Sequence, residues 1–412
     1  MKHGPSRKRF WRRHPYRTSS IAAVLLVGGA LAGYVISVAS TPLPQATMTN
    51  ALPAEVIAPA NATPVAWPSQ GEGAYLVPVF GEAASSPAQN QVPIGSVTKL
   101  MTADVVLKDF PLTPGEQGPT YTVTALDVFF TQLDLANGEA VSSVTAGEVL
   151  TEYQLLEGTL VHSSCNLADM LAKLDAGSLA PFVAKMNSQA TVLAMNATHY
   201  ADASGVSPLS TSTPASQLIL AELLMKNPVF SQIVSQTTVT LPVSGTQTTY
   251  QPLLGTQGVV GIKSGLTSQA GGCDVMAVNE IVDGQTIQVL SAVTGQKGAN
   301  DLAAAGKAAF DLATSVTKGI DIVTVASAAR PVGTLGWPQS SVNLVVAPAL
   351  TLPAWPGQHI SVTVSGRQIV TGSLPKNTKV ATVTARTPQF HVSGNVVTQK
   401  KLTVPTLLQR VV

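Results

Sequence analysis

The chain has 412 residues, of which 45% are hydrophobic and only 11% are charged. Disordered chains and coiled coils need far more charge, so the composition excludes both and predicts globular domains. Residues 1–40 hold seven bases and no acid, which leaves 17 of the 24 bases against all 22 acids in the remainder. Nucleic acid is therefore not an expected partner, because binding it needs a basic surface.

The first forty residues predict a segment that directs the chain to a membrane. The bases lie within residues 1–19, and residues 20–40 form an apolar run. At about 1.5 Å per residue, a helix of that length spans the roughly 30 Å hydrocarbon core. The basic flank is expected to stay cytoplasmic, so the rest of the chain is exported. A cleaved signal peptide, with Ser37-Val38-Ala39 as its cleavage site, is the alternative, and it also places the body outside the cytoplasm.

Proline content and residue pattern divide the exported part into three segments. Residues 41–68 contain six prolines among Ala and Thr, a composition typical of an extended linker. Residues 69–318 mix helical and strand patterns and form the main body. Residues 319–412 show no helical period, and residues 360–364 alternate strictly between apolar and polar, which predicts a small all-β domain.

The pattern of the body predicts an α/β (α+β) fold, with an antiparallel sheet flanked by helices and a separate helical lobe. Apolar periodicity favours helices over four stretches: 96–110, two short helices within 146–172, 214–225 and 301–316. Runs rich in Val and Ile favour buried strands over 258–262 and 273–282. Asp283-Gly284 then joins the second strand to another apolar run, a typical hairpin signal.

Ser96-Val97-Thr98-Lys99 opens the first predicted helix. A serine at a helix start lies at the positive end of the helix dipole, and a lysine three residues on lies one turn along the same face. A partly desolvated lysine that has lost its proton can act as base for the hydroxyl. Taken alone, the pair is equally typical of a solvated helix cap.

Ser164-Cys165-Asn166 follows 68 residues later, between two predicted helices. Its hydroxyl and amide offer a proton relay and a hydrogen-bond donor for a substrate, although Ser and Asn are also common helix caps. The only other cysteine is Cys273, so a disulfide scaffold and a multi-cysteine zinc site are excluded. Whether the two cysteines pair with each other stays open.

Lys263-Ser264-Gly265 follows the apolar run 259–262, which places it in or at the end of a strand. A strand edge there presents an ammonium group, a hydroxyl and a backbone N–H toward one cleft. Gly265 leaves room for the backbone of a substrate to approach closely. A surface lysine in a turn is the other interpretation, and the four apolar residues before it argue against free exposure.

In this order and at these spacings the three motifs resemble those of the penicillin-binding proteins and serine β-lactamases. Residues 95–103 are most similar to the nucleophile helix of the low-molecular-mass D-alanyl-D-alanine carboxypeptidases. Residues 164–172, 195–205 and 261–273 resemble that family's later motifs. The likeness covers about residues 70–318, and the C-terminal β domain agrees with the family's usual second domain in architecture only.

The resemblance implies a serine-type acyl-enzyme mechanism that needs no metal and no cofactor. Ser96 would attack the carbonyl between two D-alanines, and Lys99 would take its proton. Ser164 and Asn166 would pass a proton to the leaving amine and hold the peptide. The backbone N–H groups of Ser96 and Leu266 would form the oxyanion hole.

The resemblance also implies that the third motif binds the free carboxylate of the substrate. Lys263 and Ser264 would supply the ammonium group and the hydroxyl, with Gly265 and Leu266 beside them. Ser264 replaces the family's usual Thr but keeps the hydroxyl, so the carboxylate contact is expected to survive. Cys165 is unusual in the second motif, and its side chain need not enter the cleft.

The implied substrate is the stem pentapeptide of peptidoglycan, with β-lactams as covalent inhibitors. A serine β-lactamase is the nearest alternative, but class A enzymes need a glutamate between the second and third motifs. The sequence offers only Glu222 there, at a mid-helix position that suits solvent. A non-catalytic wall-binding or scaffold protein is the other alternative, yet it would not need the complete set of reactive side chains.

Overall fold

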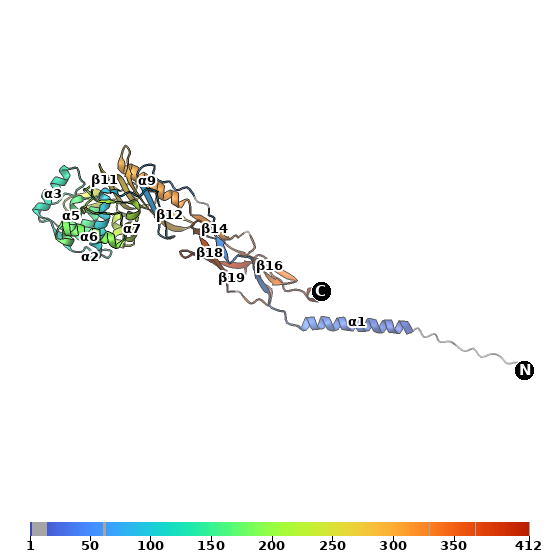
Figure 1. Ribbon diagram of the computed structural model, residues 1–412. Helices are drawn as coiled ribbons and strands as arrows, with labels where there is room; N and C mark the ends of the chain where they lie inside the picture. The colour runs from blue at the N-terminus through green and yellow to red at the C-terminus, as the bar shows by residue number, and fades with distance from the viewer. Residues whose placement is uncertain (2–14, 61–62, 329, 367, 412) are drawn as a thin grey trace. The chain divides into compact units, whose positions relative to one another are not determined.

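The computed structural model describes residues 1, 15–60, 63–328, 330–366 and 368–411 (Figure 1). Most of the predicted basic segment therefore lies outside the described residues. The chain divides into two compact units. The larger unit is Ile57–Val323 with Pro353–Gln358, and the smaller one is Met1–Val56, Thr324–Leu352 and His359–Val412.

The larger unit is built on a five-stranded antiparallel sheet in the order β11-β12-β13-β3-β4. Its strands are β3 (Glu72–Val77), β4 (Glu82–Ser85), β11 (Val259–Thr267), β12 (Gly271–Val282) and β13 (Gln285–Gln296). The two predicted strands are confirmed as β11 and β12, and β11 continues through the third motif. Asp283 and Gly284 have positive φ values of 50° and 74°, as a two-residue hairpin turn requires.

Of three helices that the sequence predicts, one packs among the other helices and two pack on this sheet. The predicted helix 96–110 is a 3₁₀ turn, η1 (Gly95–Thr98), followed by α2 (Lys99–Asp109). Nine of the eleven residues of α2 are buried, so this helix forms part of the core. α7 (Pro214–Met225) packs on β13 and β3, and α9 (Asp301–Thr317) packs on β12 and β13.

The helical part of this unit contains more helices than the sequence analysis predicts. α4 (Glu152–Leu160) and α5 (Cys165–Ala176) are the two helices expected within 146–172. Three further helices were not predicted: α3 (Ala125–Ala136), α6 (Leu179–Val192) and α8 (Pro228–Val234). In α3 the apolar side chains of Leu126 and Phe129 are exposed, so no buried stripe marks the helix. The capping box formed by Thr124 and Asp127 was the available signal.

The smaller unit holds a seven-stranded sheet in the order β1-β15-β16-β20-β19-β18-β2. The strands are β1 (Thr47–Asn50), β2 (Glu55–Ile57), β15 (Gly333–Trp337), β16 (Ser340–Val346), β18 (His359–Ser365), β19 (Lys379–Arg386) and β20 (His391–Thr398). This confirms the predicted all-β C-terminal region, whose boundaries stay a prediction.

Residues 41–68 differ from the extended linker that their composition predicts. β1 and β2 come from this segment, and β1 pairs antiparallel with β15. The indole N–H of Trp337 donates to the carbonyl of Pro44 at 2.8 Å. Pro44, Pro53 and Pro59 lie outside the two strands, so proline here bounds the strands rather than preventing them.

One helix near the N-terminus is long and apolar enough to cross a membrane. α1 spans Pro15–Ser40, and the apolar stretch within it is Ser20–Ser40. A signal sequence near the N-terminus passes the same test of length and composition, so the helix is consistent with an anchor and with a signal sequence.

Candidate active site

The predicted nucleophile Ser96 lies in η1, and Lys99 is the first residue of α2. The Nζ atom of Lys99 lies 2.8 Å from the Oγ of Ser96, as the helix spacing predicts. It also donates to the backbone carbonyl of Ser204 at 2.6 Å and lies 3.4 Å from the Sγ of Cys165. The Lys99 side chain is fully buried, so its amine is held out of water against a hydroxyl, which suits a base paired with a nucleophile.

Ser96 lies on the wall of a cavity of about 240 Å³. Residues from β11, from the loop after α3, and from the start of α5 line this cavity. The full lining is Ser96, Gly138, Glu139, Ala140, Ser163, Cys165, Tyr250, Ser264, Gly265, Leu266 and Leu302. Three separate parts of the chain therefore meet around the predicted nucleophile.

The side chains of the second motif that line the cavity come one residue earlier in the sequence than predicted. Ser164 stands at the N-cap position of α5, and its Oγ lies 2.6 Å from the Oγ of Ser142. The Oδ1 of Asn166 accepts from the Ser142 amide at 3.1 Å, and its Nδ2 donates to the Ser142 carbonyl at 2.8 Å. Neither side chain lines the cavity, whereas Ser163 and Cys165 do. The cavity wall is therefore formed by Ser163 and Cys165 rather than by Ser164 and Asn166, and Ser163 has a left-handed backbone conformation with a φ of 62°.

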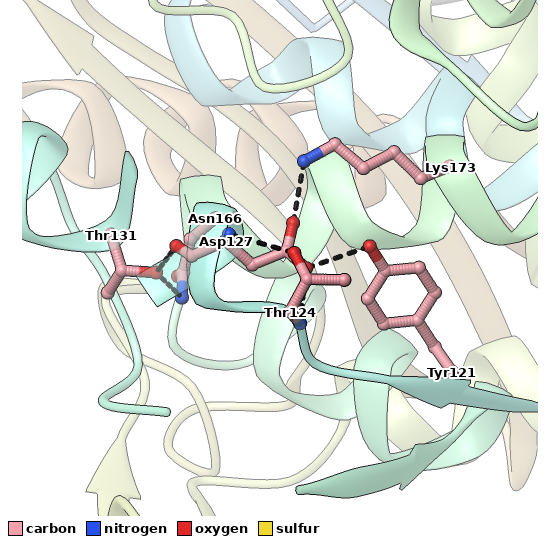
Figure 2. Close-up of polar contacts among 6 residues, drawn as sticks. All are labelled: Tyr121, Thr124, Asp127, Thr131, Asn166 and Lys173. Atoms are coloured by element: carbon pink, nitrogen blue, oxygen red, sulfur yellow. Dashed lines mark hydrogen bonds and ion pairs between the residues drawn. The ribbon is translucent and has the colours of Figure 1, made fainter. Parts of the chain in front are cut away.

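Asn166 and its neighbours attach α3 to α5 (Figure 2). The Nδ2 of Asn166 also donates to the Oγ1 of Thr131 on α3 at 3.0 Å. Asp127 of α3 pairs with Lys173 of α5 at 2.6 Å and accepts from the hydroxyl of Tyr121 at 2.9 Å. Burial alone would raise the pKa of the Asp127 carboxyl, but these hydrogen bonds, the one from Lys173 foremost, outweigh burial and lower it. The carboxylate thus stays charged and fixes α3 in place.

The third motif occupies β11, as predicted, but only part of it lines the cavity. Ser264 lines the cavity, and its Oγ donates to the carbonyl of Tyr250 at 2.9 Å. Lys263 is buried, and its Nζ donates to the carbonyl of Ser264 at 2.9 Å. Burial and the nearby charge of Lys99 lower the pKa of Lys263 to about 7, while the Asp274 carboxylate opposes this shift.

Gly265 brings the strand edge close to the nucleophile. A Cβ atom at Gly265 would lie 2.6 Å from the carbonyl oxygen of Ile94 and 3.0 Å from the amide nitrogen of Ser96. A Cβ atom at Gly95 would lie 3.1 Å from the amide nitrogen of Leu266. The η1 and β11 backbones are therefore in contact, and the missing side chain of Gly265 makes room for η1 as well as for any substrate.

Six cavity residues escaped the sequence analysis, and three of them carry polar side chains, namely Glu139, Ser163 and Tyr250. No motif marks Glu139 or Tyr250, because both reach the cavity from loops. Cys165, whose side chain was not required to enter the cleft, does line the cavity, and both it and Cys273 are free thiols. Glu222, the one glutamate between the second and third motifs, lies on α7, pairs with Lys226 at the end of that helix at 2.8 Å and is absent from the cavity lining.

The antiparallel sheet and the buried Ser–Lys pair beside its edge strand define a penicillin-binding, transpeptidase-like enzyme. A sequence profile of the D-alanyl-D-alanine carboxypeptidase family matches residues 84–297, more than half of the chain, and the chain belongs to that family. The protein is accordingly a hydrolase.

Individual relatives agree with this assignment. The chain is 30% identical over 200 residues to a D-alanyl-D-alanine carboxypeptidase from Streptomyces sp. strain K15, covering 44% of this chain and 67% of the relative. It is also 30% identical over 131 residues to a D-alanyl-D-alanine endopeptidase from Haemophilus influenzae, covering 32% of this chain and 41% of that protein.

Two solved structures share the fold. The crystal structure of the Streptomyces K15 DD-transpeptidase matches with a TM-score of 0.53 and 24% identity, covering 62% of this chain and 98% of that one. Penicillin binding protein 5 from Haemophilus influenzae matches with a TM-score of 0.57 and 17% identity, covering 83% of this chain and 100% of that one. At these identities the likeness is one of fold.

Gly265→Ala is expected to slow acylation of Ser96 by penicillin at least tenfold and to destabilise the fold by about 1–3 kcal/mol, because the new methyl group overlaps the Ile94 carbonyl. Stopped-flow acylation and thermal unfolding measure the two effects. Gly372→Ala is the control, since a Cβ there meets nothing within 4 Å. Wild-type acylation and stability in Gly265→Ala would show that the contact between η1 and β11 is dispensable.

Proposed function

We propose that the protein removes the terminal D-alanine from peptidoglycan stem pentapeptides through an acyl-enzyme on Ser96. The observation that carries this proposal is the 2.8 Å contact between the Lys99 Nζ and the Ser96 Oγ beside a cavity in a D-alanyl-D-alanine carboxypeptidase family member. A binding or scaffold protein would have no use for a lysine amine that is fully buried against one serine hydroxyl.

The reaction proceeds in two steps. The Ser96 Oγ attacks the carbonyl carbon between the two D-alanines while the Lys99 amine takes the hydroxyl proton. The tetrahedral intermediate collapses, the C–N bond breaks, and free D-alanine leaves after its nitrogen gains a proton. A water molecule then attacks the ester carbonyl, its proton passes to the Ser96 oxygen as the ester C–O bond breaks, and the shortened peptide leaves with Ser96 regenerated.

Two backbone N–H groups support the oxyanion of this intermediate. The Ser96 amide lies close to Gly265, and the Leu266 amide lies close to Gly95. This closeness supports the assignment of the two amides as the donors. Such a donor is typically worth about 3 kcal/mol in the transition state. The cavity lining also favours Ser163, rather than Ser164, as the hydroxyl that relays the proton to the leaving amine.

The substrate carboxylate binds at the β11 side of the cavity. Ser264 offers its hydroxyl there, and Lys263 supplies a positive field from behind the wall while it is protonated. Gly265 leaves the strand edge open for the substrate backbone. A carboxylate in this position presents the scissile carbonyl to Ser96.

The apolar helix α1 supports a location at the membrane. We assign residues 20–40 as a single-pass anchor, with residues 1–19 in the cytoplasm and the catalytic domain, residues 69–318, on the outer side. Residues 319–412 then form the second domain. Such an arrangement keeps the enzyme next to its cell-wall substrate.

Mass spectrometry after treatment with penicillin tests the proposed function. Wild-type protein is expected to gain one penicilloyl group on the Ser96 peptide, and Ser96→Ala to gain none. Release of D-alanine from a pentapeptide that ends in D-Ala-D-Ala is expected from wild type alone. A wild-type protein that stays unlabelled and releases no D-alanine would exclude the hydrolase mechanism.

Substitution of each serine of the second motif tests whether Ser163 or Ser164 supplies the hydroxyl that faces the leaving amine. Ser163→Ala is expected to lower the acylation rate about 10²-fold, because it removes a hydroxyl that faces the leaving amine. Ser164→Ala is expected to keep acylation within a few-fold of wild type and to lose about 1 kcal/mol of stability, since only its bond to Ser142 is removed. Penicillin acylation and urea unfolding measure the two effects. A larger loss of acylation in Ser164→Ala than in Ser163→Ala would support Ser164, the residue predicted from the sequence.

The pKa of Lys263, lowered to about 7, predicts an alkaline limb in kcat/KM. Lys263 carries its charge below that pH, so carboxylate binding weakens as the pH rises through 7. Asp274→Asn removes the carboxylate that raises this pKa, and the limb is expected to move to lower pH. A peptide with a C-terminal amide should lack the limb in both proteins. A limb that stays at the same pH in Asp274→Asn would contradict the assignment to Lys263.

A further inference from the structure

Glu139 is the one acidic residue in the cavity lining that the described part of the chain provides. It lies in the loop after α3, between Gly138 and Ala140, which also line the cavity. No hydrogen bond or ion pair reaches its carboxylate from any described residue. Lys99 is the nearby cation, and its amine is already engaged by Ser96, Ser204 and Cys165.

The surroundings of Glu139 make an unpaired carboxylate unfavourable. Burial raises the pKa of Glu139, Lys99 lowers it, and the carboxylates of Asp134 and Asp202 raise it further. Apart from Lys99, the surrounding residues therefore provide little favourable interaction to offset the desolvation of the Glu139 carboxylate. A positively charged group brought by the substrate would offset it.

The loop that carries Glu139 is fixed rather than free. The Glu139 amide donates to the carbonyl of Asp134 at 3.0 Å, which closes the C-terminal end of α3. α3 is in turn held on α5 by the Asp127–Lys173 ion pair at 2.6 Å (Figure 2). A carboxylate on such a support can select a partner by position, because little conformational freedom is lost on binding.

We propose that Glu139 is a specificity residue that binds an alkylammonium group of the peptide substrate. The inference rests on the proposed function and adds a substrate class to it: D,D-peptides that carry a free amine. β11 takes the carboxylate of the substrate at one wall, and Glu139 takes the amine at another. The two opposite charges then orient the peptide across Ser96. The amine comes either from a side chain of the peptide that is cleaved or from a second molecule that accepts the acyl group.

Two peptides that differ by one acetyl group test the first source. They are Nα-acetyl-L-lysyl-D-alanyl-D-alanine with its side-chain amine free and the same peptide with that amine acetylated. Wild type is expected to prefer the free amine about tenfold in kcat/KM, mainly through KM, as a charge-assisted hydrogen bond predicts. Glu139→Gln is expected to lose this preference. Glu222→Gln, which removes a carboxylate outside the cavity, is the control and is expected to retain it.

Glycyl-L-lysine added as an acyl acceptor tests the second source, because its α-amine can attack the ester as the free base while its side-chain ammonium group binds Glu139. If the donor preference is absent but Glu139→Gln lowers the ratio of transfer to hydrolysis about tenfold, the ammonium group belongs to the acceptor. Unchanged donor preference and unchanged transfer in Glu139→Gln would overturn the proposal. An equal fall in kcat for both peptides would also overturn it, since that result indicates a role in proton transfer instead.

Penicillin labelling separates failure of this inference from failure of the proposed function. Glu139→Gln is still expected to be acylated on Ser96, because penicillin needs no ammonium subsite. A labelled enzyme with no amine preference overturns the role of Glu139 alone. A wild-type protein that is neither labelled nor active on either peptide overturns both.

Discussion

The buried amine of Lys99 is the contact on which the site depends. Its Nζ atom touches the Ser96 hydroxyl, the Ser204 carbonyl and the Cys165 thiol, which come from three distant parts of the chain. A fully buried lysine is tolerated only where its polar partners are held in position, so each of these parts must pack correctly for the others to do so. The fold and the nucleophile are thus stabilised by the same interaction.

Close backbone contact around η1 is the second requirement. A Cβ atom at Gly205 would lie 1.9 Å from the Gly95 carbonyl, and one at Gly265 would lie 2.6 Å from the Ile94 carbonyl. The turn that carries Ser96 is therefore packed between two glycines with no room for a side chain. Because interiors are close-packed, this arrangement leaves Ser96 little freedom to move away from Lys99 or from the strand edge.

Features that depend on local patterns could be predicted from the sequence. The helix 214–225, the hairpin at Asp283-Gly284 and the pairing of Ser96 with Lys99 all follow from periods and turn residues that act over a few positions. Features that depend on tertiary context could not be predicted from the sequence. α3 exposes its apolar side chains, and the strands within 41–68 are too short to show a period.

The second motif shows most clearly why residue spacing alone was insufficient. A serine followed two residues later by a side chain that can form hydrogen bonds occurs both at Ser163 with Cys165 and at Ser164 with Asn166. Only the left-handed turn at Ser163 decides which pair faces the cavity, and no local signal marks that turn. Glu139 was hidden for a similar reason, since its position depends on where α3 ends.

The predicted cleft residue Asn166, which is absent from the cavity lining, nevertheless contributes to the cavity. Asn166 joins Ser142 to Thr131, and so connects the start of α5 with α3. α3 ends directly before the loop that carries Glu139, so this amide helps to fix one wall of the cavity without touching a substrate. An asparagine at this position can therefore be important for substrate selection through the backbone that it holds. Its loss would alter the cavity by releasing α3, which differs in kind from the removal of a group that acts on the scissile bond.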